Sequence, residues 1–169
     1  MVMIMSKSII HLKNVVNEDF VNYKKPSMFL VTSICDWKCC NEAGISSDIC
    51  QNHELVNTVT KEIDIEFLVQ SYIHNEVTKA VVIGGLEPFM QFEEIYDFIK
   101  LLRFNGCNDD IVIYTGYDKS EIEDMISQLK KFKNIIIKFG RFIPNQEYHF
   151  DPILGVNLIS NNQYAKRIS

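Results

Sequence analysis

The sequence predicts an α/β fold in which a mainly parallel sheet forms a partial, open TIM-like βα barrel. Short apolar runs alternate along the chain with longer segments whose apolar residues recur at helical spacing. Strands that are apolar throughout are typical of parallel sheets, whose crossover helices are right-handed. Only four or five such strand–helix units fit into the 169 residues, too few to close an eight-stranded barrel.

The sheet is predicted from four apolar runs that are each followed by a helix or a polar loop. These runs are residues 28–32, 79–83, 111–114 and 134–139. No composition break, repeat or low-complexity linker divides the chain, so residues 1–169 are predicted to form a single domain. At 47% hydrophobic and 23% charged residues, the chain has enough apolar mass to bury a core.

Three amphipathic helices are predicted between these strands. The first runs from Asp64, which suits an N-cap, to about Asn75. The second begins near Phe92 and stops at Asn105 and Gly106, a pair that favours a helix end. The third covers residues 122–132, where five apolar side chains share one face.

Residues with special chemistry follow the predicted strands. In chain order these are Cys35, Gly84 with Gly85, Thr115 with Gly116, and Gly140 with Arg141. Ligands of parallel α/β sheets bind at the carboxyl ends of the strands. We therefore expect these residues to converge on one rim of the partial barrel.

Charge and hydropathy narrow the classes of partner. The net charge is −5, and the one basic group, Lys130, Lys131 and Lys133, is short and suits a solvated helix end, so a nucleic-acid partner is not expected. No apolar stretch approaches the roughly 18 residues of a membrane span. The N-terminus lacks the charged region and the cleavage site of a signal peptide, so we expect a cytoplasmic protein.

Five cysteines, three of them within residues 35–40, do not suit a secreted disulfide framework. The loop after the first predicted strand contains Cys35, Cys39 and Cys40, and Cys50 follows ten positions later. Closely spaced thiolates on a loop are the usual ligands of an iron–sulfur cluster. Three thiolates instead of four would leave one iron free to bind and activate a substrate.

Other interpretations of the cysteines remain open at this point. Cys35, Cys39, Cys40 and Cys50 could hold a structural zinc ion, although zinc sites usually show two C-x2–4-C hooks. Cys40 is either a bystander or the true second ligand, and Cys107 is read as an incidental thiol. The four histidines show no metal-ligand spacing.

The cysteine loop resembles that of the radical S-adenosylmethionine superfamily and, within it, that of the activating proteins of anaerobic ribonucleotide reductase. Residues 35–39 (CDWKC) match that family's C-x-aromatic-basic-C segment, and residues 50–52 (CQN) approximate its C-aromatic-N segment. Further segments resemble family motifs in the same order: GGLEP at 84–88, YTGY at 114–117, GRF at 140–142 and NLISNNQ at 157–163. The resemblance spans residues 28–168.

The chain also departs from the family pattern. Ten residues, 40–49, stand where the family has two, and Glu42 occupies the usual place of the third cysteine. The aspartate that normally precedes the glycine of the GRF segment is replaced by Phe139.

The resemblance implies a radical S-adenosylmethionine fold, a 4Fe-4S cluster held by Cys35, Cys39 and Cys50, and S-adenosylmethionine bound beside it. The residues that it assigns to cofactor binding are Trp37, Asn52, Gly84, Gly85, Glu87, Tyr114, Thr115, Gly116, Arg141 and Asn157. No side-chain catalytic residue is implied, because the reduced cluster itself cleaves S-adenosylmethionine to a 5′-deoxyadenosyl radical.

The same resemblance implies an oxidoreductase that activates a glycyl-radical enzyme. Its expected partners are the large subunit of anaerobic ribonucleoside-triphosphate reductase and an electron donor such as flavodoxin or ferredoxin. The alternatives are a radical enzyme acting on another protein or peptide, and a non-catalytic iron–sulfur or zinc-binding module.

Overall fold

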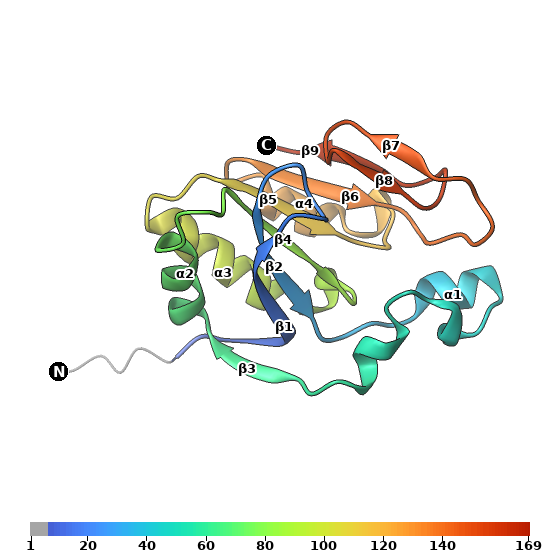
Figure 1. The fold of residues 1–169 in the computed structure, drawn as a ribbon, viewed down its shortest axis with the longest axis horizontal. Helices are drawn as coiled ribbons and strands as arrows, with labels where there is room; N and C mark the ends of the chain where they lie inside the picture. Colours follow the sequence, from blue (N-terminus) through green and yellow to red (C-terminus); the bar gives the residue numbers. More distant parts are fainter. Residues whose placement is uncertain (1–6) are drawn as a thin grey trace.

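The computed structural model of the chain describes residues 7–169 and contains a seven-stranded sheet with helices packed along one face (Figure 1). In spatial order the strands are β3 (Lys61–Asp64), β1 (Ile9–Asp19), β2 (Ser27–Thr32), β4 (Ala80–Gly85), β5 (Asp110–Tyr114), β6 (Ile135–Phe139) and β9 (Tyr164–Arg167). The central strands β2, β4, β5 and β6 pair in parallel. β1 and β3 at one edge and β9 at the other pair antiparallel. The predicted mainly parallel, open α/β sheet is therefore confirmed.

Three helices cover one face of the sheet. They are α2 (Ile65–Ile73), α3 (Phe92–Phe104) and α4 (Glu123–Leu129), and their apolar faces join alternate residues of the strands in the main core cluster. Asp64 caps α2 as the sequence predicts, because its carboxylate accepts a hydrogen bond from the backbone N–H of Glu66 at 2.9 Å. None of the helices in the described part of the chain is long and apolar enough to cross a membrane.

The opposite face of the sheet is partly covered by the C-terminal hairpin of β7 (His149–Asp151) and β8 (Val156–Leu158). Leu154 and Leu158 pack there against Val82, Val112 and Ile136 in a second, smaller core cluster. The strand residues that point away from the three helices thus form their own core near the amino ends of the strands. Its remaining members, toward the carboxyl ends, face the cavity described below.

A segment of short helices follows β2 and lies beyond the carboxyl ends of the parallel strands (Figure 1). It contains α1 (Lys38–Ala43) and the 3-10 turns Ser47–Ile49 and His53–Asn57. The ammonium group of Lys13 on β1 donates to the carbonyl oxygens of Val56 at 3.2 Å and Thr58 at 2.5 Å. These bonds attach the C-terminal end of the segment to the sheet.

Gly85 ends β4 with a backbone that suits glycine. Its φ is +96°, and a Cβ atom there would lie 2.6 Å from the Cγ1 atom of Val31 on the neighbouring strand. We expect Gly85→Ala to lower the free energy of unfolding by about 1–3 kcal/mol, because a left-handed backbone and a steric overlap act together. Chemical denaturation followed by circular dichroism measures this change.

Gly106→Ala is the matched control, because Gly106 also has positive φ (+83°) but open space where its Cβ would be. We expect Gly106→Ala to lower the free energy of unfolding less than Gly85→Ala does. Equal losses in the two variants would show that the contact with Val31 contributes nothing.

Candidate functional site

A cavity of about 640 Å³ opens at the carboxyl ends of the parallel strands. Its floor consists of alternate residues on the inner face of the sheet, and its mouth is formed by the cysteine loop and the segment that follows. The strand-end residues in its wall are Phe29, Val31, Val82, Gly84, Gly85, Tyr114, Thr115, Gly116 and Lys138, and the thiol-bearing residues are Cys35, Cys39, Cys40 and Cys50. The predicted convergence of the strand ends with the cysteine loop is thus seen as a single cavity.

Cys35 begins the loop within reach of two strand ends. Its Sγ atom accepts a hydrogen bond from the backbone N–H of Trp37 at 3.3 Å, and the preceding carbonyl, of Ile34, accepts from the N–H of Glu87 at 2.7 Å. Burial raises the pKa of the Cys35 thiol to about 12. Since a metal ligand must be a thiolate, metal binding at this residue has to displace a proton.

The other thiols lie on two sides of α1. Cys40 is buried and its thiol lies near that of Cys50, whereas Cys39 faces the end of β5. Within residues 7–169, no three His, Cys, Asp or Glu side chains are gathered closely enough to hold a single metal ion. In the described residues the cysteines therefore line one cavity, but no three of their side chains meet.

Glu87 joins the ends of β4 and β5. Its carboxylate accepts from the hydroxyl of Thr115 at 2.8 Å and from the backbone N–H groups of Gly116 and Phe89, each at 3.0 Å. Burial raises its pKa, while these hydrogen bonds favour the ionised form. Glu87 thus fixes the glycine-bearing strand ends relative to each other at the cavity wall.

Gly116 allows the cysteine loop to approach β5 closely. A Cβ atom at this position would lie 2.6 Å from Sγ of Cys39. Any other residue would therefore displace the thiol, so the glycine of the YTGY segment is required by the cysteine next to it.

Tyr114 forms a rigid part of the cavity wall. Its hydroxyl donates to the carbonyl oxygen of Asn22 at 2.5 Å, which holds the ring against the inner face of the sheet. Burial raises the pKa of this phenol above its usual range, so the hydroxyl stays protonated.

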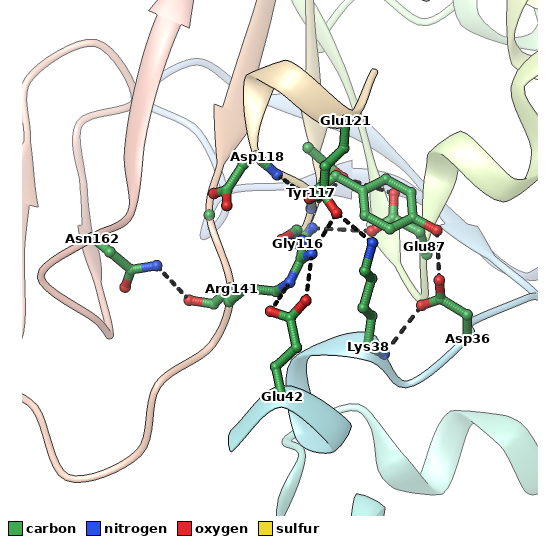
Figure 2. A network of polar contacts seen from close by, with 12 residues as sticks. Asp36, Lys38, Glu42, Glu87, Gly116, Tyr117, Asp118, Glu121, Arg141 and Asn162 are labelled. Atoms are coloured by element: carbon green, nitrogen blue, oxygen red, sulfur yellow. Dashed lines mark hydrogen bonds and ion pairs between the residues drawn. The ribbon is translucent and has the colours of Figure 1, made fainter. Parts of the chain in front are cut away.

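Arg141 lies behind the cysteine loop at the centre of a polar network (Figure 2). Its guanidinium contacts both carboxylate oxygens of Glu42 on α1, at 2.7 and 3.0 Å, one oxygen of Glu121 at 2.6 Å and the carbonyl of Gly116 at 2.6 Å. Lys38 also pairs with Glu121. Hydrogen bonds from Arg141 hold the pKa of Glu121 at about 2 and lower that of Glu42.

Tyr117 and Asp36 continue this network around the front of the cysteine loop. The Tyr117 hydroxyl donates to the Asp36 carboxylate at 2.7 Å, and that carboxylate accepts from the backbone N–H of Lys38 at 3.1 Å (Figure 2). The network therefore fastens both α1 and the turn before it to the ends of β5 and β6.

The residues that the sequence assigns to the site divide into two groups. The larger group lines the cavity and consists of Trp37, Asn52, Gly84, Gly85, Glu87, Tyr114, Thr115, Gly116 and the cysteines at 35, 39 and 50. Arg141 and Asn157 do not: Arg141 is engaged in the network described above, and Asn157 is exposed on β8.

Sequence reasoning did not assign Lys138 to the site, although this side chain is buried and lines the cavity. The signal for it is the two-residue period of a strand. Ile136 and Lys138 share the inner face of β6, so a lysine in an otherwise apolar strand must point toward the interior of the partial barrel.

The residues present fit an iron–sulfur cluster with an organic cofactor beside it. Four thiol-bearing residues line one end of the cavity, and soft thiolate ligands are those that such clusters use. Backbone atoms of Gly84, Gly85 and Gly116 are exposed in the wall, where a bound molecule can approach the main chain closely.

Two comparisons with known proteins bear on this arrangement. The model of the family described as the 4Fe-4S single cluster domain matches residues 27–163, which include the whole cysteine loop and every strand end around the cavity. A search of curated proteins finds no match to the chain.

Proposed function

The chain belongs to the 4Fe-4S single cluster domain family, a radical S-adenosylmethionine family typical of activating enzymes, and from this premise we propose that it activates anaerobic ribonucleoside-triphosphate reductase by generating a glycyl radical on it. The observation that carries the proposal is the joining of thiols and glycine-bearing strand ends in one cavity. A radical S-adenosylmethionine enzyme needs a 4Fe-4S cluster and S-adenosylmethionine side by side, and the family implies both.

The cofactors supply the chemistry that no side chain could. A bound, reduced cluster would supply the one electron that cleaves the S–C5′ bond of S-adenosylmethionine into methionine and a 5′-deoxyadenosyl radical, the species needed to remove a hydrogen atom from a glycine Cα. The protein's own contribution is to bind, orient and exclude water.

Named residues can provide these contributions. Cys35, Cys39 and Cys50 would hold the cluster at the mouth of the cavity, while Gly84 and Gly85 would let a bound molecule lie against the main chain of β4. Glu87 keeps β4 and β5 in register beside it. Phe29, Leu86 and Phe142 give the wall an apolar surface that disfavours water.

A protein substrate is supported by the openness of the sheet. Its two edge strands, β3 and β9, do not pair with each other, so the barrel is incomplete on that side. A glycine-bearing loop of a large partner could enter there. A second protein, of the flavodoxin or ferredoxin class, would supply the electron.

One observation favours a second candidate, a radical enzyme acting on another protein or a peptide. The segment between Cys39 and Cys50 is longer, by residues 40–49, than in the reductase activators that the sequence resembles. Cys40 from this insertion lines the cavity, and so do Glu54, Leu55 and Thr58 of the segment that follows Cys50. A longer segment at the mouth of the site is where a different target would be recognised.

The test is anaerobic incubation of the reconstituted protein with reductant, S-adenosylmethionine and the candidate reductase. We expect 5′-deoxyadenosine to form together with a glycyl radical signal in electron paramagnetic resonance spectra. Formation of 5′-deoxyadenosine without that signal would reject the reductase as target and favour the second candidate. A colourless protein that binds zinc would reject radical chemistry altogether.

A further inference from the structure

Lys138 is a buried cation in the wall of the cavity. Its residue is 7% exposed, and its ammonium group donates to two backbone carbonyl oxygens, of Thr115 at 3.3 Å and Gly140 at 3.2 Å. Within residues 7–169 it forms no ion pair with a carboxylate. An ammonium has three N–H donors, so one of them has no partner in the described protein.

A buried charge without a counter-ion is costly, and proteins seldom keep one unless something compensates for it. Burial lowers the pKa of Lys138 to about 8. The nearby carboxylate of Glu87 is already engaged by Thr115, Gly116 and Phe89. The charges of Glu87 and Lys138 favour each other's ionised form, but no hydrogen bond or ion pair joins the two groups within the described residues. The cavity therefore leaves room for a further negative charge beside the ammonium of Lys138.

The thiol of Cys39 is placed to supply that charge once it is ionised. The ammonium of Lys138 contacts the carbonyl oxygen of Thr115, and Sγ of Cys39 lies against the α-carbon of Gly116, the next residue. A single peptide unit thus separates the cation from the thiol.

We propose that Lys138 is the buried counter-charge of the cluster that Cys39 helps to hold, and that it raises the reduction potential of that cluster. Adding an electron makes the cluster and its thiolates more negative, and a fixed positive charge nearby stabilises the reduced form. The inference rests on the cluster of the proposed function but not on the identity of the protein target.

Arg141 is also a cation close to Cys39, but its charge is already neutralised. It contacts the carboxylates of Glu42 and Glu121 at 2.6–3.0 Å. Lys138 makes no such contact within the described residues, so its charge is not offset by a paired carboxylate.

The experiment is an anaerobic redox titration of the reconstituted cluster, followed by electron paramagnetic resonance without S-adenosylmethionine. Lys138→Met and Lys138→Gln both remove the charge, one with an apolar and one with a polar side chain. We expect each to reduce the equilibrium constant for cluster reduction about tenfold, a fall of about 59 mV for one electron. Lys138→Arg keeps the charge and should keep the potential.

Lys166→Met is the matched control. Lys166 is exposed on β9 opposite Ile137, one register position from Lys138, and it is not among the residues lining the cavity. Its loss changes the net charge equally and should leave the potential unchanged. Equal potentials in the wild type and both neutral Lys138 variants would overturn the proposal.

The alternative is that Lys138 binds the carboxylate of S-adenosylmethionine. Equilibrium dialysis of S-adenosylmethionine with the Lys138 variants distinguishes this role from the proposed one. Weaker binding with an unchanged potential would assign Lys138 to the cofactor's carboxylate and overturn the inference. The redox titration contains no reductase, so its result does not depend on whether a glycyl radical forms. The proposed role of Lys138 is therefore tested independently of the proposed protein target.

Discussion

Replacing Cys35 with alanine is expected to reduce cluster iron to background and to abolish formation of 5′-deoxyadenosine. Cys35 follows β2 after two residues and is held at the cavity, with its Sγ accepting from Trp37 at 3.3 Å. If three thiolates hold the cluster, removing one leaves only two ligands, too few to retain it. Iron and sulfide analysis after anaerobic reconstitution, with the cofactor assay in parallel, measures the loss.

The neighbouring cysteines test the choice of ligands. Cys39→Ala and Cys50→Ala should behave as Cys35→Ala does, whereas Cys40→Ala should retain iron. Cys40 is the informative control because it also lines the cavity and its thiol lies beside that of Cys50. A Cys40→Ala protein without iron, together with a Cys39→Ala protein that keeps it, would exchange their roles.

The parallel centre of the fold was predictable because each of its strands is apolar throughout and is followed by a helix with a clear apolar stripe. Strands β4, β5 and β6 start within one residue of the predicted runs. β1 and β3 were not predicted. They pair antiparallel at an edge, and their mixed polar and apolar residues give no continuous run for sequence reasoning to detect. β3 reaches the edge of the sheet only by pairing with β1, which is distant from it in sequence.

The candidate site was likewise predictable only in part. The glycines and cysteines could be located because each follows a strand, and the carboxyl ends of parallel strands meet. Which side chains pair could not be read from the sequence. Arg141 and Glu42 are 99 positions apart, and only the folded chain shows that the residue in the usual place of a third cysteine is a carboxylate bound to arginine.

Arg141→Met is expected to lower cluster retention about tenfold, a loss typical of removing a group that orients metal ligands. Arg141 contacts three parts of the chain at once (Figure 2). It bonds to Glu42 on α1, to the carbonyl of Gly116 after β5, and to Glu121 in the turn before α4. Without it, α1 keeps only the pairing of Lys38 with Glu121, and Cys39 is held less firmly against Gly116. The rate of iron release to a chelator under anaerobic conditions measures the effect.

Arg167→Met provides the control for losing a paired arginine. Arg167 contacts Asp110 at 2.9 Å at the start of β5, the end of the strand away from the cavity. That variant should lose some thermal stability but release iron at the wild-type rate. Glu42→Gln should act in the same direction as Arg141→Met, and the double variant should be no worse than Arg141→Met alone, because the two residues act through one contact. Additive effects of the two changes would show that Arg141 does not hold the cysteine loop through Glu42.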